Sequence, residues 1–533
     1  MNRNMKVVLI ASAALAMLGA ATCFAGPEGA PPAKVTPATM PRVATIDERF
    51  QSYNIEMVEV TGGRFWKPYA APADASQATA GQQPDTTQSD TDTSRFQYRP
   101  PIDLTNARLR KLAAALGPAY VRISGTWANT TYFQNSDDPA PPTPPKGFNG
   151  VLTRRQWKGV VDFSRAVNAK IVTSFAISAG TRDAAGVWTP DLAQQLVGYT
   201  KSIGGSIAAA EFMNEPNIAM NGGGAPKDYD AAAFGRDIAV FHTFARQADP
   251  GMLILGPCGS GEATPATVAS MPALPTADLL TATGPVFDAF SYHFYGAVSS
   301  RCASYGANAT TTAAAALSEE WLARAGRDEE FYSSLRDRFE PGKPLWLTET
   351  AQAACGGDRW ASTFLDTFRY LNQLGALAKR GVQTNMHNTL DASDYALIDT
   401  RTYTPRPNYW SALIWRKLMG TTVLDPGPLP APTLHLYAHC LRNHPGGVAL
   451  LALNTDKANA QTIEVPTAAE RYTLTARELT DRVVLLNGSE LKLGAGDALP
   501  GLDGTPTHAG KVAFPPASIT FLAFPKAHNA SCQ

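Results

Sequence analysis

The sequence lacks an excess of charge of either sign. Lys and Arg together number 46, Asp and Glu together number 46, and the formal net charge is zero. Such a balance gives no support to a nucleic acid, an anionic membrane surface or a polyanion as the partner. A local basic groove that binds a polyanion is the alternative. Cysteine is also scarce, with six residues whose spacings match no zinc motif. We therefore expect neither a metal nor another cofactor.

Long hydrophobic runs are missing beyond the N-terminus. The run Val7–Ala21 follows the basic residues Arg3 and Lys6, and it is too short to span a bilayer comfortably. Cys23-Phe24-Ala25 then offers a small-residue cleavage site. We predict a signal peptide over residues 1–25 and a secreted or periplasmic protein with no membrane span after cleavage. An uncleaved anchor and lipidation at Cys23 are the alternatives.

The remaining chain alternates between helical and strand-like patterns. After a Pro- and Ala-rich lead-in at residues 26–41, eight strand–helix units follow if Asn54–Val60 is the first strand. This is the number of units in a (β/α)8 TIM barrel, an α/β fold, which we place at residues 42–425. The low-complexity segment Ala70–Ser94 is expected to be a mobile surface loop.

Short strand-like runs separated by turn residues such as Asn487-Gly488 occupy residues 426–533. This pattern of short strands and turns predicts a C-terminal β-sandwich. The sandwich could be a carbohydrate-binding module or a scaffold. We expect the chain to act as a monomer.

One stretch of the predicted barrel, Ala208–Asn217, begins apolar and ends in the polar sequence Asn214-Glu215-Pro216. Pro216 cannot extend an inner strand because it has no N–H to donate. The pattern predicts a buried fourth strand that ends at Glu215. In a barrel of parallel strands, that end carries the catalytic residues. A carboxylate that caps the next helix is the alternative.

A second stretch, Pro344–Thr350, has the same form and ends the seventh strand in Glu349. Glycoside hydrolysis typically uses two carboxylates, one as the general acid/base and one as the nucleophile or base. Two glutamates at strand ends of one barrel would form that pair. The sequence therefore predicts a glycoside hydrolase, with a catalytically dead glycan-binding barrel as the rival.

Motifs along most of the chain from Arg42 onward extend this interpretation. They are Leu109–Thr126, Glu211–Asn217, Ser291–Tyr295, Leu347–Thr350, Phe364–Lys379, Asp394–Asp399, Asn408–Trp410, His439-Cys440 and Cys532. Together these stretches resemble glycoside hydrolase family 79, the heparanase and β-glucuronidase family of clan A. Asn-Glu-Pro alone is shared by the whole clan, whereas the other motifs are more specific.

The resemblance implies roles for four residues. Glu215 would be the acid/base and Glu349 the nucleophile of a retaining mechanism. Asn214 would bond the sugar 2-OH, and Tyr295 would orient the nucleophile, with core packing as its alternative. We expect the carboxyl groups at roughly 5–5.5 Å. At that distance the charge of Glu349 should raise the pKa of Glu215.

The resemblance also implies a reader for the C6 carboxylate of a glucuronide. In the family, backbone N–H groups of a Gly-Gly loop act with tyrosine hydroxyls, and the matching residues here are Gly356, Gly357 and Tyr395. The chain has Cys355 where the family often has a tyrosine. Glu56 lies near the position of a family Asp that faces the sugar.

Two further positions follow from the ends of predicted strands. Asn388 and the neighbouring His387 end strand eight and are expected to line the pocket. His293 could line it too or could be a packed strand histidine. The thin basic patch of Arg154, Arg155 and Lys158 is no strong heparin-binding motif, and a solvated helix face is the alternative.

The cysteines lead to one pairing. Cys440 ends a predicted strand and Cys532 is the penultimate residue, and the family pairs its corresponding sandwich cysteines, so we predict a disulfide between them. Cys258, Cys302 and Cys355 are then expected to be free.

The predicted activity is retaining hydrolysis of β-glucuronides. The substrate would be a polysaccharide, an oligosaccharide or a small molecule that carries glucuronic acid. A retaining clan A enzyme for a neutral sugar is the alternative, and endo- against exo-action stays open.

Overall fold

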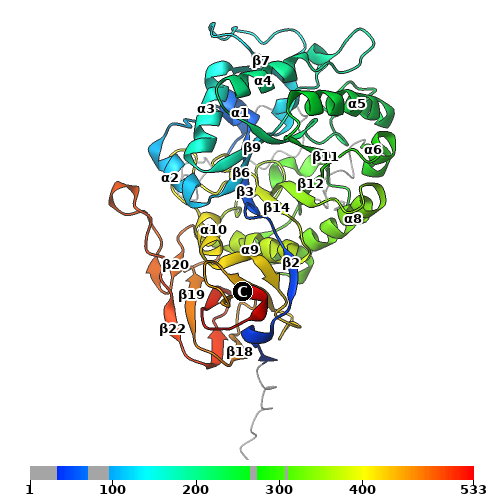
Figure 1. The fold of residues 1–533 in the computed structure, drawn as a ribbon. Helices are drawn as coiled ribbons and strands as arrows, with labels where there is room; N and C mark the ends of the chain where they lie inside the picture. The colour runs from blue at the N-terminus through cyan, green and yellow to red at the C-terminus, as the bar shows by residue number, and fades with distance from the viewer. Residues whose placement is uncertain (1–32, 70–94, 264–272, 306–309) are drawn as a thin grey trace, which may run out of the picture.

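The computed structural model describes residues 33–69, 95–263, 273–305 and 310–533 (Figure 1). The predicted signal peptide, the first part of the predicted lead-in and the whole segment Ala70–Ser94 lie outside these residues. Within the described part of the chain, no helix is long and apolar enough to cross a membrane.

The predicted barrel is confirmed. Eight parallel strands close on themselves in the order β10-β11-β12-β13-β14-β3-β6-β9. In chain order the strands are β3 (Gln51–Glu56), β6 (Ala119–Ser124), β9 (Ala169–Ser174), β10 (Ile207–Glu211), β11 (Leu253–Ser260), β12 (Ala289–Tyr295), β13 (Leu345–Ala351) and β14 (Thr384–His387). All residues of β6, β12 and β13 are buried, as expected for parallel strands covered by helices.

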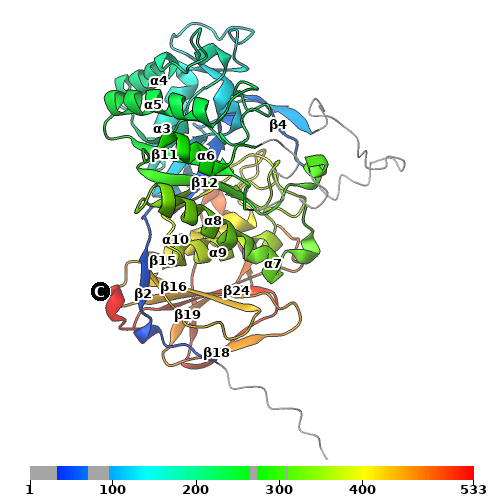
Figure 2. The same ribbon diagram turned by 90° about the vertical axis from the view of Figure 1, so that its right-hand side faces the viewer.

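Helices surround the barrel strands (Figures 1 and 2). The principal helices are α2 (Ala107–Ala115), α3 (Arg154–Ala166), α4 (Asp191–Ser202), α5 (Ala231–Ala248), α6 (Thr276–Thr283), α8 (Arg324–Phe339), α9 (Phe364–Lys379) and α10 (Pro407–Leu418). Helix α3 shows why they form. Thr153 and Gln156 make a capping box at its start, while Trp157 and Val160 are buried on one face.

Shorter elements lie between these units. They are α1 (Met57–Thr61), α7 (Glu319–Leu322), the antiparallel pair β4 (Gly63–Trp66) and β5 (Phe96–Arg99), and the parallel pair β7 (Thr131–Gln134) and β8 (Gly150–Thr153).

Two predicted strand ends were wrong. The first barrel strand covers Gln51–Glu56 instead of Asn54–Val60, because Glu59 accepts a hydrogen bond from the Glu56 amide at 2.7 Å and helix α1 begins there. Strand β10 ends at Glu211, so Glu215 lies in the following loop, where its φ is +48°.

The C-terminal sandwich is built from two sheets. The larger has nine strands in the order β2-β15-β16-β17-β24-β19-β20-β21, with β22 paired to β19, and the smaller has the order β1-β18-β23. Their bounds are β1 (Ala33–Lys34), β2 (Arg42–Thr45), β15 (Met419–Leu424), β16 (Leu434–Leu441), β17 (Val448–Asn454), β18 (Gln461–Val465), β19 (Ala469–Thr475), β20 (Leu485–Leu486), β21 (Ser489–Glu490), β22 (Thr505–Thr507), β23 (Gly510–Phe514) and β24 (Ser518–Phe524).

The sandwich takes strands from both ends of the barrel sequence. Strand β1 pairs with β18, strand β2 pairs with β15, and β15 itself precedes residue 426. The expected lead-in therefore contains an ordered strand, and the expected boundaries at residues 42 and 426 do not match the sheet pairing. The cause is that backbone N–H and C=O groups on edge strands of the sandwich form their hydrogen bonds with strands far away in the sequence.

Helix α9 lies between barrel and sandwich (Figure 2) and is buried over almost its whole length. The hydroxyl of Tyr437 in β16 donates to Asn372 at 2.6 Å, and its ring lies where a Cβ on Gly375 would stand. A side chain at Gly375 would push the two parts apart. The close contact joins the barrel and the sandwich into one packed unit.

The described residues contain two disulfides. The predicted Cys440–Cys532 bond is confirmed, and Cys258 is free and buried as expected. The expectation that Cys302 and Cys355 are free was wrong, because they form a second disulfide. Their loops follow β12 and β13 and are joined by a bridge between Val298 and Ala354. This proximity arises because β12 and β13 pair as neighbouring strands.

Candidate active site

Glu215 and Glu349 meet at the carboxyl ends of the barrel strands. Glu349 lies in β13, and Glu215 lies in the loop after β10. One oxygen of each carboxylate and one nitrogen of His293 all lie within 4.8 Å of one another. His293 Nδ1 is 3.1 Å from Glu215 Oε1 and 3.8 Å from Glu349 Oε2. The structure thus brings together the two glutamates that the sequence singled out.

Arg122 in β6 joins Glu349 to Glu211 and Asn214 by hydrogen bonds. Its Nη1 donates to Glu349 Oε2 at 2.7 Å, and its Nε donates to Glu211 Oε2 at 2.9 Å. Its Nη2 donates to Asn214 Oδ1 at 2.8 Å. The Arg122 side chain is 1% exposed, so water screens these charge-assisted bonds little.

Tyr295 and Asn388 hold Glu349 from the other side. The Tyr295 hydroxyl donates to Glu349 Oε1 at 2.7 Å. Burial and the charge of Glu349 raise the pKa of Tyr295 well above its usual value, so its hydroxyl keeps its hydrogen. Asn388 Nδ2 lies 3.0 Å from the Tyr295 hydroxyl, 3.2 Å from the Tyr395 hydroxyl and 3.1 Å from Glu56 Oε1. Asn388 is the shared neighbour of all three.

Glu56 is a third carboxyl group in the site. Burial, followed by the charge of Glu349, raises its pKa to about 8. Its Oε2 is buried with no hydrogen-bond partner among the described residues, and it occupies the space that a Cβ on Gly125 would fill. At neutral pH, Glu56 is therefore a neutral acid with a hydrogen to donate.

His293 controls the protonation of Glu215. Burial lowers the pKa of His293, but the neighbouring Cys258 and Glu349 raise it well above its usual value. The protonated ring donates from Nδ1 to Glu215 Oε1 at 3.1 Å, while its Nε2 lies 3.2 Å from Arg122 Nη2. Burial is the largest single influence and raises the pKa of Glu215, but the hydrogen bond and charge of His293, the hydrogen bond of Ser260 and the charge of Arg122 together lower the pKa below its usual value. The predicted upward shift caused by Glu349 was therefore wrong.

The other predicted residues occupy defined places around this centre. Gly356 and Gly357 form a turn after β13, and a Cβ on Gly357 would stand 3.1 Å from the Tyr395 Cβ. His387 does not contact the carboxylates, because its Nε2 lies 2.8 Å from the Tyr395 carbonyl and burial lowers its pKa to about 4. The basic patch is neutralised in part, since Arg154 pairs with Asp137 and Lys158 with Asp162.

Sequence reasoning missed four residues of the site. Arg122 and Glu211 are charged residues within apolar strands, a signal that could have identified them. Asn129 exchanges hydrogen bonds with the Asn214 backbone at 2.9 and 3.0 Å, and Cys258 Sγ lies 3.1 Å from His293 Nε2. No local pattern distinguishes Asn129 or Cys258 from other buried residues.

Comparison with solved structures defines the class of fold. A 4-O-α-L-rhamnosyl-β-D-glucuronidase from Fusarium oxysporum matches with a TM-score of 0.61 and 14% identity over 92% of this chain and 100% of that chain. An α-L-arabinofuranosidase from Thermotoga maritima matches with a TM-score of 0.59 and 13% identity over 92% of this chain and 98% of that chain. These low identities show the fold alone, which is that of (β/α)8 glycosidases with a β-sandwich.

Comparison of sequences points to a particular family. Heparanase-like protein 1 from Arabidopsis thaliana is 27% identical over 68% of this chain and 67% of its own length. Heparanase from Mus musculus is 28% identical over 80% of this chain and 88% of its own length. A baicalin-β-D-glucuronidase from Scutellaria baicalensis is 35% identical over 30% of this chain and 31% of its own length. No family model matches the chain. The chain is thus similar to heparanase-like proteins over most of its length.

Proposed function

We propose that the protein is a glycoside hydrolase that cleaves β-glucuronides with retention of configuration. The observation that carries this proposal is the pair Glu215 and Glu349, with oxygens within 4.8 Å of each other. Retaining enzymes place their carboxyl groups at about 5–5.5 Å, whereas inverting enzymes leave room for a water between them. The names of the relatives, heparanase and glucuronidase, support the class of substrate.

Glu349 is the proposed nucleophile. Arg122 and Tyr295 each donate a hydrogen bond to one of its carboxylate oxygens and hold the carboxylate in place to attack the anomeric carbon and form a glycosyl ester. Glu215 gives its proton to the leaving oxygen in this step and takes one from water in the next. The downward shift of the Glu215 pKa means that its protonated form is present mainly at acidic pH.

Asn214 is the proposed donor to the sugar 2-OH. Its Oδ1 accepts from Arg122, which turns the amide nitrogen away from the guanidinium. The amide nitrogen lies 3.5 Å from the Thr126 hydroxyl and has a second hydrogen for the sugar 2-OH, a bond that would strengthen in the transition state. Glu56, neutral below a pH of about 8, offers a hydrogen to another sugar oxygen.

The turn after β13 is the proposed reader of the C6 carboxylate. The amides of Cys355 and Gly356 donate to no partner among the described residues, whereas the Gly357 amide bonds Ala353. The Tyr395 hydroxyl accepts from Asn388 and keeps its own hydrogen for a further acceptor. Amide and hydroxyl hydrogens at one place suit a carboxylate ligand.

We also propose that the protein works outside the cytoplasm as a monomer. Two disulfides suit an oxidising compartment. A secreted or periplasmic location agrees with the N-terminal sequence pattern described above.

The test is turnover of 4-nitrophenyl β-glucuronide against the matching glucoside and galactoside, with proton NMR of the first-formed anomer. We expect glucuronide to be preferred and the β-anomer to appear first. Faster turnover of a neutral glycoside would favour the neutral-sugar alternative, and an α-anomer would refute retention. Binding of glucuronide with no turnover of any glycoside would support a non-catalytic glycan-binding protein. Size analysis of products from heparan sulfate then separates endo- from exo-action.

A further inference from the structure

The turn that follows Glu349 has an unfavourable backbone. Cys355, Gly356 and Gly357 have φ values of +61°, +83° and +80°, so three consecutive residues are left-handed. Glycine adopts this conformation readily, but cysteine does so at a cost. A turn of this kind persists only where surrounding contacts impose it. The contacts around Cys355 therefore decide the shape of the turn.

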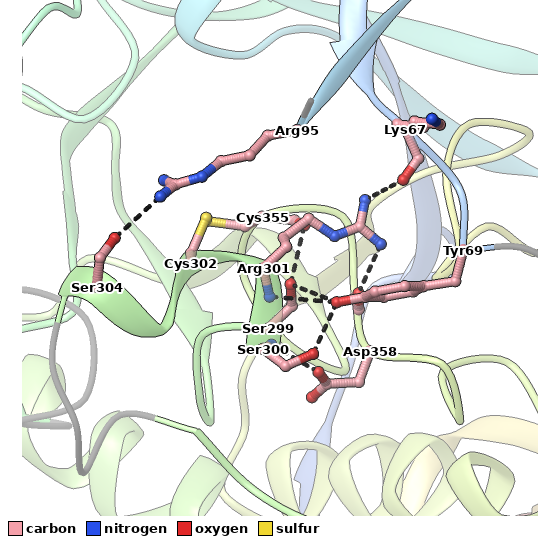
Figure 3. The surroundings of a disulfide bond; sticks show 11 residues. Lys67, Tyr69, Arg95, Ser299, Ser300, Arg301, Cys302, Ser304, Cys355 and Asp358 are labelled. Atoms are coloured by element: carbon pink, nitrogen blue, oxygen red, sulfur yellow. Dashed lines mark hydrogen bonds between the residues drawn. A yellow bond between two sulfur atoms is a disulfide. The ribbon is translucent and has the colours of Figure 1, made fainter. Parts of the chain in front are cut away.

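The segment after β12 supplies most of those contacts (Figure 3). Cys302 forms the disulfide with Cys355. The Ser299 hydroxyl donates to the Cys355 carbonyl at 3.3 Å, and the Ser299 amide donates to the Ala354 carbonyl at 3.0 Å. Arg301 Nη2 donates to the Gly357 carbonyl at 3.3 Å. One covalent bond and three hydrogen bonds thus attach the turn to a single neighbouring segment.

Arg301 connects this segment to the loop that carries Tyr395. Its Nη2 donates to Asp394 Oδ2 at 2.6 Å, and its guanidinium lies 4.0 Å above the ring of Tyr69. The Asp394 amide donates in turn to the Gly356 carbonyl at 3.1 Å. The turn and Tyr395 are therefore held in one frame, in which the disulfide is the covalent link.

These contacts occupy carbonyl groups and leave hydrogens free. The carbonyls of Cys355, Gly356 and Gly357 all accept hydrogen bonds, whereas the amides of Cys355 and Gly356 donate to no described residue. Gly356 is a buried residue, and a backbone amide without a partner is rare at a buried position. We propose that the Cys302–Cys355 disulfide is a positioning element that directs these amides at the substrate carboxylate and so sets the preference for a uronic acid over an uncharged sugar.

This inference rests on the proposed function and assigns the disulfide no chemical step. The disulfide is connected to Glu349 only through several intermediate contacts. Asn388 donates to the hydroxyls of Tyr395 and Tyr295, and the Tyr295 hydroxyl donates to Glu349. Loss of the disulfide should therefore weaken binding of the carboxylate more than it slows bond cleavage.

The test compares two substrates on two variants. The substrates are 4-nitrophenyl β-glucuronide and its uncharged C6 amide. The variants are Cys302→Ser/Cys355→Ser and, as a matched control, Cys440→Ser/Cys532→Ser in the sandwich. We expect the first variant to lose about tenfold in the glucuronide-to-amide ratio of kcat/KM, mainly through KM, as for loss of a hydrogen bond to a charged group. The control should keep the wild-type ratio.

Other results would overturn the inference. An unchanged ratio, or a parallel loss on both substrates, would make the disulfide purely structural. If the first variant does not fold, the control variant can be reduced in its folded state, with alkylation mapped by mass spectrometry. The ratio should fall as Cys302 and Cys355 become alkylated, and a constant ratio would refute the inference. Failure of the wild-type protein to cleave the glucuronide would instead refute the proposed function.

Discussion

The mouth of the barrel and the core of the sandwich are buried to a similar degree but differ in chemistry. Around Arg122 the barrel buries Glu211, Glu349 and His293, each at most 6% exposed. The sandwich core consists of apolar side chains such as Leu450 and Phe524. Buried charges give little net stability even when paired, because desolvation offsets their attraction. The barrel mouth is thus organised for chemistry, whereas the sandwich contributes stability.

The two disulfides repeat this contrast. Cys440–Cys532 ties the C-terminal end of the chain to strand β16, where a terminus would otherwise fray. Cys302–Cys355 joins two loops that follow neighbouring barrel strands beside the candidate active site. The same covalent bond is therefore expected to affect stability in one region and substrate preference in the other.

The largest effect should come from Glu349→Gln. The amide cannot attack the anomeric carbon, so we expect kcat on 4-nitrophenyl β-glucuronide to fall by about 10⁴-fold or more, as for removal of a nucleophile. The isosteric side chain keeps one oxygen that can accept from Arg122, and its NH2 group can donate to the Tyr295 hydroxyl oxygen, so the melting temperature should stay close to that of the wild type. Steady-state kinetics and calorimetry check both points. Appreciable remaining turnover would exclude Glu349 as the nucleophile.

The opposite pattern is expected for Cys440→Ser/Cys532→Ser. The bond closes a loop with a sequence separation of 92 residues. The chain-entropy model assigns such a loop about 4–5 kcal/mol of stabilisation, and measured values are often smaller. We expect a lower midpoint in urea unfolding, with kcat and KM unchanged at 25 °C. A loss of activity without loss of stability would contradict the division between the two regions.

A smaller effect is expected on the pH profile. The Glu215 pKa is lowered, so its protonated form is lost as pH rises through that low value and kcat/KM should fall on the alkaline side. In His293→Ala, burial would no longer be opposed by the histidine bond, and the pKa should rise. We expect the alkaline limb to move upward by about one pH unit.

The control for this prediction is a substrate with a strongly activated leaving group. Such a substrate needs little protonation, so its first step should depend less on the ionisation of Glu215. An alkaline limb that stays in place in His293→Ala would show that His293 does not set the Glu215 pKa.

Much of this architecture could be predicted because its causes are local. Apolar runs such as Leu345–Leu347 form barrel strands, and Thr153 with Gln156 starts a helix, from short-range patterns alone. Glu349 was predictable because a carboxylate near the end of such a strand is unusual. The position of Glu215 was predicted less well, since β10 ends earlier and a loop carries this residue to the site.

The sequence by itself determined the order of strands and helices, the two glutamates and the pairing of the terminal cysteine, because periodicity and motifs are written along the chain. Only the tertiary structure decided that Arg122 joins Glu211 to Glu349, and that Cys302 meets Cys355. Those contacts connect residues 53 to 227 positions apart, and they exist only once neighbouring strands are in register. Register in a closed barrel is a property of all eight strands together, which no single stretch of sequence specifies.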